Sequence, residues 1–143
     1  MALQRVESPR FDSGPRPLPH DASALTEEEG GAMLRALINL FDRWGLEDRE
    51  AATLLGQLPR TYVRWKQGST GRFGPDVLAR MSNLLGIHKA LRLIFVEPSR
   101  GYAWIKAPNE AFGGRSALEV MMGGALTDLM RVRRYLDAER GGW

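Results

Sequence analysis

Cysteine is absent from the 143 residues of the chain, and histidine occurs only at positions 20 and 88. The missing thiols exclude disulfide bonds, thiolate zinc sites and a cysteine nucleophile. His20 and His88 lie far apart, and neither has a second ligand at a metal-binding spacing, so we expect no metal site. The stretch GSTGRFG lacks the Lys-Ser/Thr pair that ends a phosphate-binding loop, so we do not expect it to bind phosphate. We expect no cofactor.

Long apolar runs are missing as well. No stretch approaches the ~20 apolar residues that a membrane-spanning helix needs. Charges interrupt the first residues, MALQRVESPRFDSG, which therefore do not resemble the apolar core of a secretory signal. We expect a cytoplasmic protein with no membrane association.

The composition is that of an ordinary soluble protein, with 43% hydrophobic and 26% charged residues. The length suits one domain or two small helical subdomains. No nucleophile, base and orienting group can be assembled into a catalytic set, so we do not expect an enzyme.

Positive charge is concentrated in one segment, although the net charge of the whole chain is only +3. Between Gln57 and Arg80 the only acid is Asp76, which leaves a local excess of four positive charges; the basic residues are Arg60, Arg64, Lys66, Arg72 and Arg80. Such an excess attracts a polyanion. A solvated helix face would show the same charge pattern, and the sequence leaves both interpretations open.

Proline-rich and apolar-periodic stretches divide the chain into three parts. Residues 1–24 contain four prolines and no apolar period, which predicts a disordered or extended arm. The rest predicts helices, the first capped at Thr26. A break is expected near Gly86, and a turn or short hairpin over residues 97–114. The predicted helices cover residues 26–45, 46–56, 59–68, 75–96, 116–122 and 125–140.

The stretch DREAATLLGQLPRTYVRWKQG has the parts of a helix-turn-helix, with Gly56 in the turn. The second helix of such a unit places its N-terminal side chains against base edges in the major groove. Val63 and Trp65 are expected to face inward. The predicted DNA-contacting residues are Arg60, Thr61, Tyr62, Arg64 and Lys66, and the arginines suit guanine whereas the lysine suits phosphate.

Leu58 departs from this pattern, because a serine or threonine cap is expected before Pro59. Either a backbone donor finds another partner, or Leu58 anchors the turn by apolar contacts. A helical core with a basic surface and no DNA binding is the competing interpretation.

The last predicted helix carries an apolar stripe of Ala125, Leu129, Val132 and Leu136, which indicates a core or partner face. The chain then ends in Gly-Gly-Trp. The order of a helix-turn-helix region, then YAWIKAPNEAFGGRSALEVMMGG, then LMRVRRYLDAERGGW resembles the Xre/MbcA/ParS antitoxins over about residues 30–143.

These antitoxins are partners of RES-domain toxins in bacterial type II toxin–antitoxin pairs. The resemblance implies a toxin that consumes NAD or transfers ADP-ribose from it, and an antitoxin whose C-terminal tail enters the toxin's NAD pocket. It also implies that a functional helix-turn-helix represses the operon. The toxin-binding residues that the resemblance implies are Arg131, Arg134, Tyr135, Arg140, Gly141, Gly142 and Trp143.

The resemblance also bears on the C-terminal tail and on the residues that precede the last helix. Gly141 and Gly142 let the chain leave the last helix freely, and Trp143 either fills the partner's pocket or folds back on its own domain. A second group of residues is expected to shape the C-terminal domain without touching the toxin: Asn109, Phe112, Gly113, Gly114, Ser116 and Glu119.

The sequence thus predicts an all-α protein: an arm over 1–24, an Xre-like helix-turn-helix domain over 25–97, and a helical toxin-binding domain over 98–143 with a short strand-like connector. The expected partners are a RES-domain toxin and operator DNA, with a homodimer inside the toxin–antitoxin complex. The alternative function is a stand-alone transcriptional repressor whose C-terminal domain only dimerises.

Overall fold

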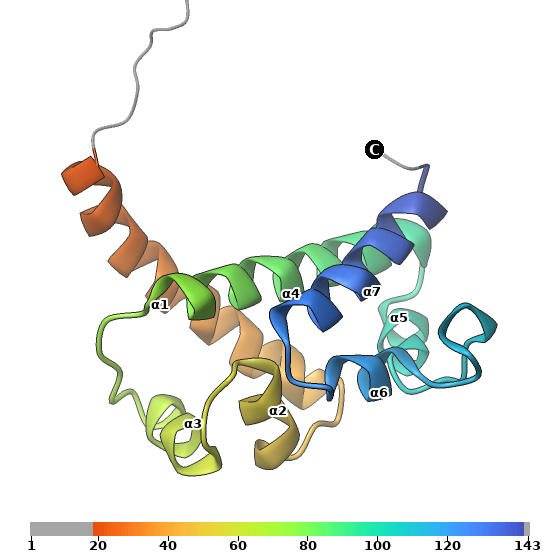
Figure 1. The fold of residues 1–143 in the computed structure, drawn as a ribbon, viewed down its shortest axis with the longest axis horizontal. Coiled ribbons are helices and arrows are strands. Elements are labelled where there is room, and N and C mark those ends of the chain that lie inside the picture. Colours follow the sequence, from red (N-terminus) through yellow and green to blue (C-terminus); the bar gives the residue numbers. More distant parts are fainter. Residues whose placement is uncertain (1–18, 142–143) are drawn as a thin grey trace, which may run out of the picture.

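The computed structural model describes residues 19–141, which form seven α-helices and one short 3-10 helix (Figure 1). The helices are α1 (Pro19–Arg43), α2 (Asp48–Leu54), α3 (Pro59–Lys66), α4 (Pro75–Ile94), α5 (Pro98–Trp104), α6 (Ala117–Met121) and α7 (Leu126–Glu139), with η2 at Glu110–Phe112. Within the described range, β structure is limited to a single antiparallel bridge between Pro108 and Ser116. The all-α prediction is confirmed.

The first helix is longer than predicted. It begins at Pro19, so Thr26 is inside the helix and is not its cap, and residues 19–24 do not belong to an extended arm. Proline is well suited to the first position of a helix because its fixed φ is helical and its missing N–H has no partner there. The remainder of the predicted arm, residues 1–18, lies outside the described residues.

Helix α4 is continuous, and the break predicted near Gly86 is wrong. A Cβ atom on Gly86 would lie 2.5 Å from the guanidinium of Arg133 on α7. The glycine therefore permits the close approach of α7 to α4, and this packing offsets the roughly 1 kcal/mol that glycine costs inside a helix.

A single hydrophobic core joins the two parts that the sequence analysis assigned to residues 25–97 and 98–143. Helix α4 packs against α1, α5 and α7, and Figure 1 shows α4 and α7 running side by side. The largest fully buried side chains come from α1, α2, α4, α6 and α7 and from the residues that follow α2 and α5: Leu37, Phe41, Leu54, Leu55, Met81, Leu84, Ile87, Ile105, Met121, Leu129, Val132 and Leu136.

The connector between α4 and α6 contains the predicted turn, closed by the bridge between Pro108 and Ser116, but only in its second half. Its first half is helix α5, which starts at Pro98. The second half is a tight turn in which Gly113 and Gly114 take φ values of 68° and 89°, a left-handed conformation that glycine adopts without strain.

Hydrogen bonds from side chains fix both ends of this turn. The Asn109 side chain accepts a hydrogen bond from the backbone N–H of Ala111 (2.8 Å). Ser116 and Glu119 form a reciprocal capping box at the start of α6, as the sequence predicted. Phe112 of η2 is buried. The expectation that these residues shape the domain is confirmed, and the absence of toxin contact stays a prediction.

Candidate functional sites

The helix-turn-helix is present, built from α2 and α3. Three residues of α2 are buried, and Gly56 turns the chain with a φ of 68°. A Cβ on Gly56 would also lie 2.8 Å from Nε of Arg80. This turn therefore needs glycine both for its backbone conformation and for space.

Helix α3 presents part of the predicted DNA-contacting set to solvent. Arg60 and Arg64 are exposed and Thr61 is half-buried. Pro59 occupies the first turn of α3, which also contains Arg60 and Thr61, whereas Arg64 lies in the last turn of the helix. Contact with DNA through Arg60, Thr61 and Arg64 stays a prediction.

Tyr62 does not belong to this set, and its predicted DNA contact is wrong. Its side chain is only 2% exposed and its ring lies 6.2 Å from that of Phe41 on α1. Burial, together with the charges of Asp48 and Asp42, raises the pKa of Tyr62 to about 12. Burial disfavours the phenolate, so Tyr62 acts as a core residue of the unit.

The two α3 residues expected to face inward are only half-buried. Trp65 packs edge-on against Phe73, with ring centroids 5.3 Å apart, and Val63 is half-buried. Phe73 in turn lies against Gly30 of α1, where a Cβ would come within 2.7 Å of its ring. Trp65 and Phe73 thus fasten the loop after α3 to α1.

The remaining basic residues of the segment are more constrained than the charge count indicates. Lys66 donates to Asp48 on α2 at 2.6 Å and lies 5.5 Å from the centre of the Tyr62 ring. Arg72 pairs with Glu27 at 2.7 Å. Asp48 therefore partly neutralises Lys66, and contact of Lys66 with a DNA phosphate stays a prediction.

Arg80 is a buried structural residue, only 8% exposed. It pairs with Asp76 and donates to the backbone carbonyls of Leu54 (3.4 Å) and Gly124 (2.8 Å). Arg80 therefore ties the end of α2 to the turn between α6 and α7, and its charge is not offered to a polyanion.

Leu58 does not anchor the turn. It occupies the cap position of α3 with no side-chain cap, and it is 58% exposed. The apolar-anchor interpretation is wrong because the buried positions in this region are taken by Leu54, Leu55 and Tyr62.

The second candidate surface is the outer face of α7. Arg131, Arg134 and Tyr135 are spaced by three and four residues, so they share one side of the helix. The Arg131 guanidinium lies 5.3 Å from the centre of the Phe112 ring. This surface combines the positive charge of two arginines with aromatic rings that lie beside them.

An aromatic cluster that the sequence analysis missed supports this face. Tyr135 stacks on Trp104 with centroids 6.1 Å apart and planes 9° apart, and Phe112 meets both rings at steeper angles. The three residues come from α7, α5 and η2, so no local spacing could have revealed the cluster.

Two comparisons with known proteins bear on these surfaces. The family model described as the Antitoxin Xre-like helix-turn-helix domain matches residues 16–86, and the Antitoxin Xre/MbcA/ParS C-terminal toxin-binding domain matches residues 90–142. The chain is also 43% identical over 112 residues to y4oB, an uncharacterized protein of Sinorhizobium fredii, in an alignment covering 78% of this chain and 86% of that protein.

The chain belongs to the Xre/MbcA/ParS antitoxin family. It is therefore an antitoxin of the type II class, with a helix-turn-helix unit and a toxin-binding domain. Both matches meet inside α4, between residues 86 and 90, so one continuous helix belongs to both parts of the antitoxin.

The antitoxin does not bring all of the predicted toxin-binding residues together. Arg140 lies on the other flank of α7, beside Arg133, and both arginines contact Asp137, at 3.6 Å and 3.8 Å respectively. Gly141 has a φ of 119°, which ends the helix as predicted. Gly142 and Trp143 lie outside the described residues.

Two further findings concern what the described helices lack. None of the helices between Pro19 and Glu139 is long and apolar enough to cross a membrane. In the same part of the antitoxin, no three His, Cys, Asp or Glu side chains are grouped so that they could hold a metal ion.

Proposed function

We propose that this antitoxin neutralises a RES-domain toxin, one that consumes NAD or transfers ADP-ribose from it, by placing its C-terminal tail in the toxin's NAD pocket. The observation that carries the proposal is the position of the basic and aromatic α7 face, which leads directly into the tail at Gly141. Arg131 and Arg134 would contact the toxin surface while the tail enters the pocket.

The energetic contribution of the tail rests on its last residue. A tryptophan buried in a pocket removes about 150–250 Å² from water. At ~25 cal/mol per Å² this is roughly 4–6 kcal/mol before the cost of ordering the tail. An indole of this kind is a typical interface hot spot.

The mechanism is steric and involves no chemistry by the antitoxin. The tail and NAD would compete for one cavity, so inhibition should weaken as the NAD concentration rises. Arg140 is held by Asp137 on the α7 flank, so its part in toxin binding would require it to leave this partner.

The test uses the antitoxin co-purified with the product of the adjacent reading frame, followed by an assay of NAD consumption. Full-length antitoxin should stop NAD loss. The chain lacking Gly141–Trp143 should still co-purify through α7 but should leave NAD consumption active. Trp143→Phe serves as the matched control, because it keeps an aromatic ring, and should inhibit better than Trp143→Ala.

Three results would contradict parts of this proposal. Undiminished neutralisation by the shortened chain would reject tail insertion. A co-purified partner that leaves NAD intact would reject a RES-domain toxin. Failure of any protein to co-purify, together with tight DNA binding by the antitoxin alone, would favour the stand-alone repressor.

We also propose that the antitoxin binds operator DNA through α3 as a homodimer and so represses its own operon. The exposed Arg60 and Arg64 support base or phosphate contacts. A two-fold operator suits two copies of the unit. Light scattering of the antitoxin alone should give a dimer mass; a monomer at every concentration would contradict this part.

A further inference from the structure

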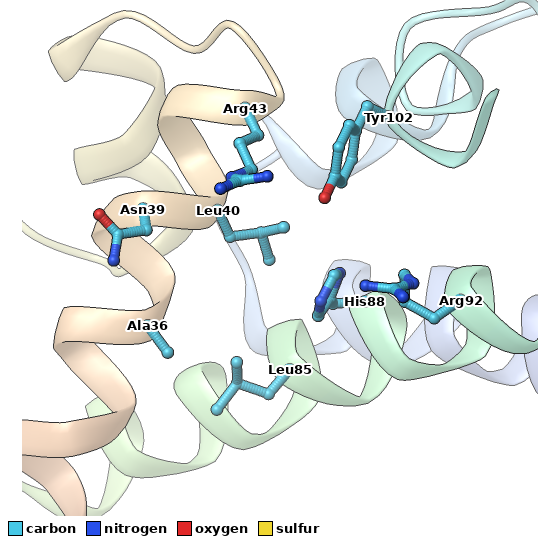
Figure 2. Close-up of a pocket in the computed structure, with 8 residues that line it drawn as sticks. All are labelled: Ala36, Asn39, Leu40, Arg43, Leu85, His88, Arg92 and Tyr102. Atoms are coloured by element: carbon cyan, nitrogen blue, oxygen red, sulfur yellow. The ribbon is translucent and has the colours of Figure 1, made fainter. Parts of the chain in front are cut away.

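A basic pocket of about 300 Å³ lies between α1, α4 and α5, away from α3 (Figure 2). Arg43 comes from the end of α1, His88 and Arg92 from the second half of α4, and Tyr102 from α5. Their polar ends turn toward one shared space, and Leu40 and Leu85 contribute apolar wall (Figure 2). None of these residues belongs to the surfaces assigned to toxin or DNA above.

The charge of this pocket is not balanced by its own walls. No carboxylate is among the described residues that line it. Within the described part of the chain, neither Arg43 nor Arg92 forms an ion pair. Two cations that face one space repel each other, and this repulsion is strongest where water is partly excluded.

The pKa of His88 responds both to burial and to the positive charges of the pocket. Burial, followed by the charges of Arg92 and Arg43, lowers the pKa of His88. Its Nδ1 atom is buried and has no hydrogen-bond partner in the structure. Buried polar atoms are nearly always satisfied, so this nitrogen is an exception in the wall of the pocket. It is shielded from solvent, and the groups that can reach a ligand are those of Arg43, Arg92 and Tyr102.

We propose that this pocket binds a small organic phosphate, a phosphate monoester about the size of a sugar phosphate or mononucleotide. A monoester phosphate carries up to two negative charges and three acceptor oxygens that point in different directions. Arg43, Arg92 and the Tyr102 hydroxyl approach from different helices, which suits these oxygens better than the two coplanar oxygens of a carboxylate. The apolar wall and the volume, at the lower end of ligand pockets, leave room for an organic group beside the phosphate.

Binding there would connect the two parts of the antitoxin. Arg43 lies in the segment matched by the helix-turn-helix model, whereas Arg92 and Tyr102 lie in the segment matched by the toxin-binding model. A ligand held by both segments would stabilise their packing. This inference does not depend on tail insertion or on DNA binding.

The test is isothermal titration calorimetry and thermal unfolding of the full-length antitoxin with AMP, ribose 5-phosphate, inorganic phosphate, adenosine and acetate. We expect saturable binding of AMP or ribose 5-phosphate at one site per chain with a raised Tm. Inorganic phosphate should compete for the site, and adenosine and acetate should not bind.

Three variants locate the site. Arg43→Met and Arg92→Met should each weaken phosphate-ester binding by about tenfold or more, because each removes a charge-assisted hydrogen bond. The control Arg72→Met, which removes an exposed arginine elsewhere, should leave binding unchanged. Without ligand, the two pocket variants should be at least as stable as the natural chain, because repulsion is relieved; this separates loss of binding from loss of folding.

Several outcomes would overturn the proposal. These are no saturable binding of either ester at millimolar concentration, equal binding by all three variants, or a stronger response to acetate than to the esters. A loss of DNA affinity in Arg43→Met or Arg92→Met without any ester binding would also overturn it, since the pocket would then be a DNA phosphate contact.

Discussion

At the scale of single residues, Arg80 shows how a side chain that looks like part of a basic surface can be a structural tie. Its guanidinium satisfies the carbonyls of Leu54 and Gly124, which are far apart in the sequence. The nearby Asp76 carboxylate balances its charge at 2.7 Å. No local pattern distinguishes this arginine from Arg72, because the distinction depends on what α4 packs against.

We predict that Arg80→Met lowers the free energy of unfolding by about 2–4 kcal/mol, because it leaves two backbone carbonyls and a carboxylate without their partner. Urea denaturation measures this. The matched control is Arg72→Met, whose exposed pair with Glu27 should contribute no more than about 0.5 kcal/mol. Equal effects of the two substitutions would contradict the assigned role of Arg80.

His88 predicts a pH dependence of stability. Its pKa is lower in the folded chain than the ordinary value of about 6.5. The unfolded chain therefore binds the proton more readily, so this contribution to stability is present above about pH 6.5 and is lost as pH falls below it. The charged groups that face His88 are Arg43 from α1 and Arg92 from its own helix, and the Tyr102 hydroxyl of α5 lines the same pocket.

We expect the unfolding free energy of the natural chain to fall more steeply between pH 6.5 and pH 5 than that of His88→Gln, a range set by the ordinary histidine pKa. Chemical denaturation at a series of pH values measures both slopes. Parallel curves for the two proteins would show that the folded environment of His88 does not disfavour its charge.

At the scale of elements, several helix ends were predictable, although the start of α1 and the whole of α5 were not. The rotation of the short helix α3 about its axis was not predictable either. Capping signals such as Ser116 with Glu119, and glycines at Gly45 and Gly56, act within a few residues, so the sequence alone carries them. Helix α3 has only eight residues and three apolar or aromatic candidates for burial. Which of these three side chains is buried depends on packing against α1, where Phe41 contacts Tyr62.

The break predicted at Gly86 failed for a related reason. A glycine inside a helical pattern can indicate either a break in the helix or a close contact with another helix. The sequence does not show which partner helix packs there, so it cannot distinguish the two. Here Arg133 of α7 occupies the space above Gly86. The aromatic support of the α7 face was likewise hidden, since Trp104, Phe112 and Tyr135 meet only after three elements have folded.

Helix α3 gives a prediction at this scale. Arg60→Met and Arg64→Met should each weaken binding to the DNA upstream of the gene by about tenfold or more and should reduce its salt dependence. Fluorescence anisotropy at several salt concentrations measures both. Arg49→Met is the control, because Arg49 is exposed on α2 and pairs locally with Glu47. Unchanged affinity in both α3 variants would remove α3 from the DNA contact.

At the scale of the whole molecule, the two candidate surfaces lie at opposite ends. Figure 1 shows α3 at the lower left and the C-terminal end of α7 at the upper right, with α4 between them. The two surfaces share no residue, so we expect toxin and DNA to be bound without direct competition.

This separation predicts two independent classes of variant. Arg131→Glu with Arg134→Glu should abolish toxin co-purification and leave DNA affinity within about twofold, because changes at distant sites are usually independent. Arg60→Met with Arg64→Met should do the reverse. If the α7 double variant also lost DNA binding while its Tm stayed unchanged, the two surfaces would be coupled or overlapping.

The continuity of helix α4 has a consequence for truncation and proteolysis of this antitoxin. Its twenty residues form one helix that belongs to both halves, with Leu84 and Ile87 inside the shared core. A truncation or a protease cut within α4 would remove buried residues that the remaining half needs for its core. We expect that neither half folds by itself, so one cleavage within α4 would abolish the proposed DNA binding and the proposed toxin binding together.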